Sequence, residues 1–243
     1  MEDYISKVIK FADLSQNKPL NEIVFEGLRD AIIKGIIPVG ERINETVYSE
    51  RMNISRTPIR EALRRIQEEG LVEYIPHYGV VVKKITIADA EEIFQIRKAL
   101  DVLATTNAMK LMSESEFDEM KMLLEKTDAA NDRNEVAEVV RLFSEFNAMI
   151  YRFSRMPRLD IIVQRLREYL VRFRDISLSG PERRKKAIDE HWIIYQNMRK
   201  GNPEQVAIIT NEHLDYSKTY IIAEMIKIEK KRDEEEKRKQ NGI

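Results

Sequence analysis

The stretch from Ile54 to Tyr78 constrains the fold more than any other part of the chain. Its apolar residues recur at the i, i+3, i+4 and i+7 positions of a helix, and they are Ile59, Ala62, Leu63 and Ile66. This spacing predicts one buried stripe along a helix that Ser55 caps, that reaches Glu69 and that stops at Gly70. Arginines at positions 56, 60 and 64 line up beside the stripe, four residues apart.

A hairpin is expected directly after this helix. Two runs rich in β-forming residues, 71–75 and 79–83, are separated by Pro76, His77 and Tyr78, which suit its tip. Two shorter helices are expected before it, at 20–34 and at 45–52, and Asn44 is a plausible cap for the second. Three short helices followed by a hairpin make a winged helix-turn-helix.

From Thr86 onward the pattern is helical, with hardly any strand signal. Capping residues and prolines divide this part into six expected helices, at 86–111, 113–130, 134–154, 157–178, 181–200 and 203–231. The predicted fold is therefore mainly α, an N-terminal winged helix-turn-helix followed by a six-helix antiparallel bundle. The expected divisions are an N-terminal extension (1–17), the winged helix-turn-helix (18–85), an all-helical effector-binding and dimerisation domain (86–232) and a charged tail (233–243).

Composition narrows the class of protein. The chain of 243 residues has no cysteine, which excludes disulfides and thiolate chemistry and fits a reducing cytoplasm. Neither a secretion signal nor a long apolar run is found, so we expect a cytoplasmic protein without a membrane partner. The net charge of −1 means that binding to nucleic acid would need a local basic patch. Such a patch exists, because the segment from Ser55 to Arg65 contains a single acid, Glu61, and four arginines, Arg56, Arg60, Arg64 and Arg65.

The arginines have two interpretations. They can solvate the exposed side of a core helix, as arginines often do. The start Ser-Arg-Thr, the one-sided row and the hairpin that follows favour a helix that reads double-stranded DNA, since such helices place N-terminal residues on base edges and phosphates. The expected DNA contacts on the helix are Ser55, Arg56, Thr57, Arg60 and Arg64.

The segment SRTPIREALRRIQEEGLVEYIPHYGVVV resembles the signature of the GntR family of bacterial transcriptional regulators. The helical part resembles the FadR-like branch, which carries a C-terminal FCD effector domain. The resemblance implies that the wing contacts the minor groove through Gly79 with His77 or Tyr78. The helix at 45–52 departs from the family pattern at Thr46, Tyr48, Ser49 and Asn53, so the operator sequence does not carry over.

Many FCD domains bind a divalent metal through an Asp and a His one turn apart plus two further histidines. The segments FNAMIYRFSRMPRL, HWIIYQNMRKGNPEQ and NEHL resemble those helices. Phe143 and Asn147 stand at the first two ligand positions, while His191 and His213 remain. Two imidazoles and a neutral amide are a weak set for a transition metal. A metal on His191 and His213 stays open, and a metal-free polar pocket is the favoured expectation.

Such a pocket would suit an anion. Arg97 precedes Asp101 by one helical turn, matching a family position where an arginine is followed four residues later by an acid. Arg97 can clamp a carboxylate with two parallel hydrogen bonds, or it can form only an intrahelical ion pair with Asp101. Arg97, Asn147, His191 and His213 are the expected effector site for a small carboxylate.

The sequence thus predicts a homodimeric, non-enzymatic regulator whose affinity for a DNA operator is controlled by a small organic acid. One alternative is the same regulator responding to an acyl-CoA. Another is a metal-dependent hydrolase in the helical domain, although the chain has no HExxH, no GxSxG and no phosphate-binding glycine-rich loop.

Overall fold

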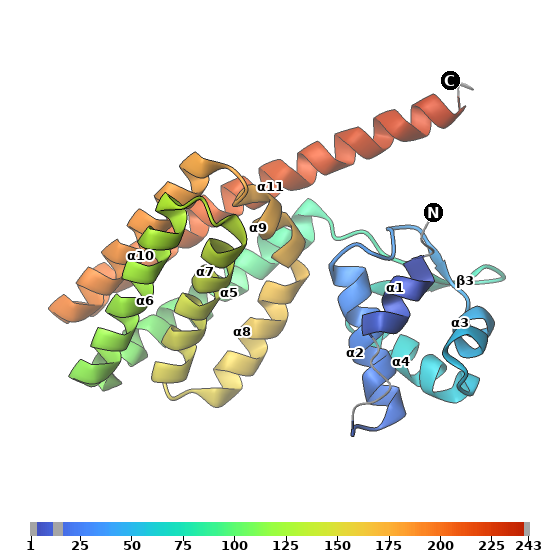
Figure 1. Ribbon diagram of the computed structural model, residues 1–243, viewed down its shortest axis with the longest axis horizontal. Helices are drawn as coiled ribbons and strands as arrows, with labels where there is room; N and C mark the ends of the chain where they lie inside the picture. The colour runs from blue at the N-terminus through green and yellow to red at the C-terminus, as the bar shows by residue number, and fades with distance from the viewer. Residues whose placement is uncertain (1–3, 12–16, 241–243) are drawn as a thin grey trace. The chain divides into compact units, whose positions relative to one another are not determined.

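The computed structural model describes residues 4–11 and 17–240 of the chain. The residues group into two compact units, Met1–Thr86 and Ile87–Ile243, each with its own core (Figure 1). The predicted fold class is confirmed: the chain is mainly helical, with a small sheet in the first unit. No helix in the described part of the chain is long and apolar enough to cross a membrane.

The first unit is a winged helix-turn-helix. Its elements are α1 (Tyr4–Phe11), α2 (Leu20–Ile33), β1 (Arg42–Ile43), α3 (Glu45–Met52), α4 (Arg56–Glu68), β2 (Val72–Ile75) and β3 (Gly79–Val82). The predicted stripe on α4 is buried and packs on α2 and α3. Asn44 caps α3 as expected, because its side chain accepts hydrogen bonds from the amides of Thr46 and Val47.

Three features of this unit were not predicted. Strand β1 pairs with β3, so the hairpin is part of a three-stranded antiparallel sheet of order β1-β3-β2. The expected N-terminal extension contains α1, whose Ile5 and Val8 are buried and which packs on α2. Ser55 occupies the N-cap position of α4, but its side chain makes no capping hydrogen bond.

The second unit is a helical bundle. Its helices are α5 (Ile87–Leu111), α6 (Glu114–Asp132), α7 (Val136–Phe153), α8 (Pro157–Tyr169), α9 (Val171–Ser177), α10 (Pro181–Lys200) and α11 (Pro203–Gln240). Helix α5 packs chiefly against α11 and also contacts α7, α8 and α10. A single apolar core joins residues from α5, α6, α7, α8, α10 and α11.

One predicted helix of the bundle is divided in two. The segment expected to be continuous over 157–178 breaks at Leu170, whose φ of −108° and ψ of 2° lie outside the helical range. The Leu170 side chain is buried, and α9 continues in a new direction to pack against α11. No glycine or proline marks this break, so the sequence contains no local signal for it.

Candidate functional site

The first candidate site is the exposed face of α4 and the wing. Ser55, Arg56, Thr57, Arg60 and Arg64 are all exposed, as a surface that contacts DNA requires. Arg65, which belongs to the same basic cluster of the sequence, lies elsewhere. It pairs with Glu22 at 2.6 Å and stacks over the ring of Phe25, so it stabilises the packing of α4 on α2.

Two arginines of α4 are held by a residue of α3. The Glu45 carboxylate accepts hydrogen bonds through Oε2 from Arg60 at 3.0 and 3.3 Å and from Arg56 at 3.3 Å. Partial burial raises the pKa of the Glu45 carboxyl, but the bonds from Arg60 and Arg56 outweigh this, so the pKa lies below its usual value. Glu45 therefore links the two helices of the motif through the side chains expected to reach DNA.

The wing turn depends on backbone conformations that few residues adopt. His77 has a φ of 65° and Gly79 a φ of 112°. A Cβ atom on Gly79 would lie 3.3 Å from Nε of Arg42, whose guanidinium also faces the ring of Tyr78. Glycine at position 79 thus allows β1 and the wing to approach closely, with His77 and Tyr78 exposed at the tip.

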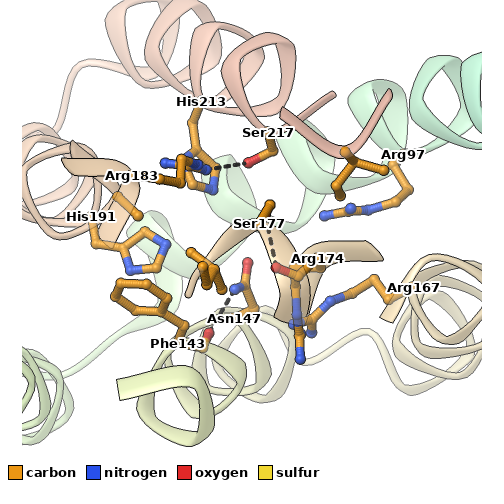
Figure 2. A pocket seen from close by; sticks show the side chains of 13 residues that line it. Arg97, Phe143, Asn147, Arg167, Arg174, Ser177, Arg183, His191, His213 and Ser217 are labelled. Carbon is orange, nitrogen blue, oxygen red and sulfur yellow. Dashed lines mark hydrogen bonds between the residues drawn. The ribbon is translucent and has the colours of Figure 1, made fainter. Parts of the chain in front are cut away.

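The second candidate site is a cavity of about 50 Å³ inside the helical bundle. All four residues of the expected effector site line it: Arg97 from α5, Asn147 from α7, His191 from α10 and His213 from α11 (Figure 2). The side chains come from four different helices, so only the folded bundle brings them together. The pocket is therefore polar on several sides despite its place next to the apolar core.

Arg97 forms the ion pair with Asp101 and also lines the cavity, so the two roles considered from the sequence are compatible. Its Nη2 donates to Oδ2 of Asp101 at 2.8 Å, and both side chains are buried. The hydroxyl of Tyr151 donates to the other carboxylate oxygen, Oδ1, at 2.8 Å. Asp101 thus holds Arg97 in place while Arg97 still lines the cavity, and Nε of Arg97 is buried with no hydrogen-bond partner in the structure.

The histidines lie against aromatic rings. His191 stacks on Phe146 at a centroid distance of 4.2 Å and meets the edge of Phe143 at 4.9 Å. Burial lowers the pKa of His191 well below its usual value, and the positive charges nearby lower it further. Nδ1 of His213 lies 2.8 Å from Oε2 of Glu190. His191 thus lies against two phenylalanine rings, in surroundings that disfavour its protonated form.

The donors present do not suit a divalent metal. Phe143 presents only carbon to the cavity, and Asn147 donates its amide to the carbonyl oxygen of Phe143 at 2.7 Å. In the described part of the chain, no group of three or more His, Cys, Asp or Glu side chains is placed to hold a metal ion. The residues that line the cavity beside the two histidines include four arginines, and cations repel a metal. Among the described residues, the one carboxylate in contact with a histidine, Glu190, is shared between His213 and Arg183.

Sequence reasoning missed three arginines of this pocket. Arg167 from α8, Arg174 from α9 and Arg183 from α10 also line it, together with Ser177 and Ser217 (Figure 2). Arg167 and Arg174 lie on two different helices, α8 and α9, because the chain breaks at Leu170 between them, so helical spacing in the sequence does not indicate that they meet. Their meeting with Arg97 and Arg183 depends on the packing of four helices and leaves no trace in local sequence.

A winged helix-turn-helix joined to a helical domain is an arrangement typical of DNA-binding transcriptional regulators. Two family models match the chain: "Bacterial regulatory proteins, gntR family" over residues 20–82 and "FCD domain" over residues 92–216. The chain belongs to the GntR family of bacterial transcriptional regulators and carries an FCD domain.

Individual relatives agree with this assignment. The chain is 29% identical over 181 residues to the HTH-type transcriptional regulator YdhC of Bacillus subtilis, covering 74% of this chain and 81% of the relative. It is 24% identical to the HTH-type transcriptional repressor RspR of Escherichia coli, covering 83% and 88%. Among solved structures, E. coli McbR/YncC shares the fold, with a TM-score of 0.66, 20% identity and coverage of 84% and 98%.

Proposed function

We propose that a small organic acid, bound in the FCD pocket, controls the affinity of this regulator for its DNA operator. The observation that carries the proposal is Arg97, a buried guanidinium that Asp101 holds in place while its Nε lacks a hydrogen-bond partner in the described structure. A carboxylate entering the cavity would accept that hydrogen bond. Asn147 can contribute as well, because its Nδ2 carries two hydrogens and donates one of them to the carbonyl oxygen of Phe143, which leaves the second for a carboxylate.

The DNA contacts proposed for each protomer lie on α4 and the wing. They are Ser55, Arg56, Thr57, Arg60, Arg64, His77, Tyr78 and Gly79. The arginines would pair with phosphates and guanine edges, while the hydroxyl of Ser55, which makes no capping bond, remains available for a phosphate. We propose that a homodimer presents two such surfaces to a palindromic operator in the cytoplasm, because two half-sites make a small contact specific.

The dimer would have two arrangements, one that fits the operator and one that does not. The effector can change the affinity for DNA only as far as it binds one arrangement more tightly than the other. An acyl-CoA is a poorer candidate than a small acid, because a cavity of about 50 Å³ cannot enclose a nucleotide. A metal-dependent hydrolase is also disfavoured, since no group of three or more His, Cys, Asp or Glu side chains in the described residues is placed to hold a metal ion.

The test begins with an operator selected from random duplexes by the full-length protein. Its affinity is then measured with and without a panel of small carboxylates. Arg97→Ala should keep operator binding and lose the response, whereas Arg158→Ala, an exposed arginine in the same unit, should retain it. A response that Arg97→Ala leaves unaltered contradicts the pocket assignment.

Loss of Arg97 leaves Asp101 buried without its partner, so a second variant guards against misfolding. Asn147→Asp preserves shape and places a negative charge inside the cavity. This variant should repel a carboxylate and weaken the response while the protein still binds its operator. Unchanged sensitivity to the acid in a folded Asn147→Asp protein also counts against the proposal.

A further inference from the structure

The FCD pocket contains more positive charge than is required to neutralise one carboxylate. Four arginines line the cavity, Arg97, Arg167, Arg174 and Arg183, and no carboxylate is among the described lining residues. In Figure 2, Arg97 and Arg167 approach from one side, whereas Arg183 lies on the other side with His213. The cavity thus has two cationic ends rather than one.

Each end offers hydrogen-bond donors that the protein does not use. Nε of Arg97 at one end and Nε of Arg183 at the other are buried, and the structure shows no partner for either. Arg97 and Arg183 are 9% and 6% exposed, so bulk water does not satisfy these donors. Arg183 is otherwise held by Ser217 at 3.1 Å and, less closely, by Glu190 at 3.5 Å.

Arg167 is the least neutralised cation of the cluster. Within the described residues its guanidinium makes no hydrogen bond or ion pair, and it lies 5.7 Å from the centre of the Tyr151 ring. Burial lowers the pKa of Arg167 below its usual value, and the charges of Arg97 and Arg174 lower it further, against an opposing effect of Tyr151. An anion beside Arg167 would relieve this repulsion.

The carboxylates near the cluster are already engaged. Asp101 is bound to Arg97 and Tyr151. Glu190 is shared between Arg183 and His213 through the same oxygen, Oε2. A third acid, Asp175, pairs with Arg174 at 2.7 Å and is about half exposed, and Glu145 pairs with Arg141. Asp101 raises the pKa of Arg167 slightly through its charge, but none of these acids forms an ion pair with Arg167 among the described residues.

The cluster can also be approached from outside. Arg167 and Arg174 line a second, more open hollow of about 360 Å³, together with two acids, Glu145 and Glu168, and with Ser144, Ala148, Gln164 and Val171. The same two guanidinium groups therefore border both the inner cavity and the outer hollow. Both arginines can therefore be reached from the outer hollow as well as from the inner cavity.

We propose that the pocket selects a short dicarboxylate, with one carboxylate on Arg97 and Arg167 and the other on Arg183. This inference rests on the proposed function and names the chemical class of the effector. A phosphate concentrates its charge on one group, which serves one end of the cavity only. Two separated cationic ends favour two separated carboxylates, and the small inner volume favours a short chain.

The test compares dicarboxylates with monocarboxylates of equal carbon number by isothermal titration calorimetry on the full-length protein. The probes are malonate, succinate and glutarate against propionate, butyrate and valerate, with inorganic phosphate as a separate arm. At least one dicarboxylate should bind ten-fold or more tightly than its monocarboxylate and more tightly than phosphate. Equal binding within every pair, or tightest binding of phosphate, overturns the proposal.

Variants locate the two ends. Arg167→Gln breaks no ion pair among the described residues, so it should fold normally and lose most of the preference for dicarboxylate. Arg183→Lys should lose it too, because an ammonium group cannot replace the planar guanidinium. Arg158→Gln, on the exposed face of α8, is the matched control and should keep the preference. A preference that survives both pocket variants overturns the proposal.

The operator assay separates this inference from the proposed function. If monocarboxylates bind and shift operator affinity as strongly as dicarboxylates, the dicarboxylate proposal fails and the proposed function stands. If a dicarboxylate binds selectively but operator affinity does not change, the proposed control of DNA binding fails and the specificity of the pocket stands. If no acid binds, both fail.

Discussion

Replacing Glu45 with glutamine is expected to make operator recognition less selective. Oε2 of Glu45 holds Arg60 and Arg56, two long exposed side chains of the helix proposed to read DNA. Holding them in one arrangement before binding reduces the conformational entropy that is lost on the DNA. Glutamine preserves the shape of the side chain and removes its charge, so both arginines should become more mobile.

The magnitude follows from the exposure of the partners. The side chains of Arg56 and Arg60 are 54% and 65% exposed, so water screens each ion pair and each contributes about 0.2–1 kcal/mol. Together they give about 0.4–2 kcal/mol, which corresponds to a roughly 2- to 30-fold loss in the ratio of operator affinity to nonspecific affinity. Nonspecific affinity itself should rise slightly, because a negative charge near the phosphates is lost.

Fluorescence anisotropy with the selected operator and an unrelated duplex of equal length measures this ratio. Glu50→Gln is the matched control, since it removes the same charge from an exposed position on α3 that makes no bond to either arginine. The operator ratio should fall in Glu45→Gln and stay nearly constant in Glu50→Gln. Equal changes in the two variants would refute the positioning role, because net charge alone would then explain the effect.

Three further predictions concern other contacts. Tyr151→Phe removes a hydrogen bond to the buried Asp101 carboxylate, and should lower the free energy of unfolding by about 1.5–3 kcal/mol in denaturant titrations. The pKa of His191 is lower in the folded state than in the unfolded state, so the unfolded state binds more protons and stability should fall as pH drops below about 6.5. In thermal unfolding experiments, the stability of His191→Asn should depend less on pH than that of the unchanged protein. His77→Asn, in the exposed wing, is the control and should keep the pH dependence. Gly79→Ala introduces a Cβ at a φ of 112° and should weaken operator binding while the helical unit melts unchanged.

Much of the fold could be predicted because its signals are local. The apolar stripe of α4, the Asn44 cap of α3 and the hairpin turn each lie within a few residues of the structure they specify. The division at Leu170 could not be predicted in this way. It replaces a helical conformation by one that buries the leucine and lets α9 pack on α11, so tertiary contacts override local propensity.

The residues of the pocket, too, could be predicted from the sequence only in part. Arg97, Asn147, His191 and His213 could be expected together because the family resemblance supplies positions that are distant in sequence. Whether the Arg97 ion pair would be exposed or buried depended on helix packing: the pair is buried, and the Tyr151 hydroxyl donates to Asp101 from another helix. The same reasoning from local sequence placed Arg65 in one basic cluster with the DNA-facing arginines, whereas packing on α2 turns it toward Glu22.

The sequence alone determined the class of this protein, because periodicity, caps and the motif around Ser55 are encoded by neighbouring residues. It also determined that Phe143 and Asn147 replace two family metal ligands. Only the tertiary structure decided what surrounds the histidines instead, since arginines from α5, α8, α9 and α10 converge on one cavity. The physical reason is that charge in a pocket depends on distances through space, and helices far apart in the chain set those distances.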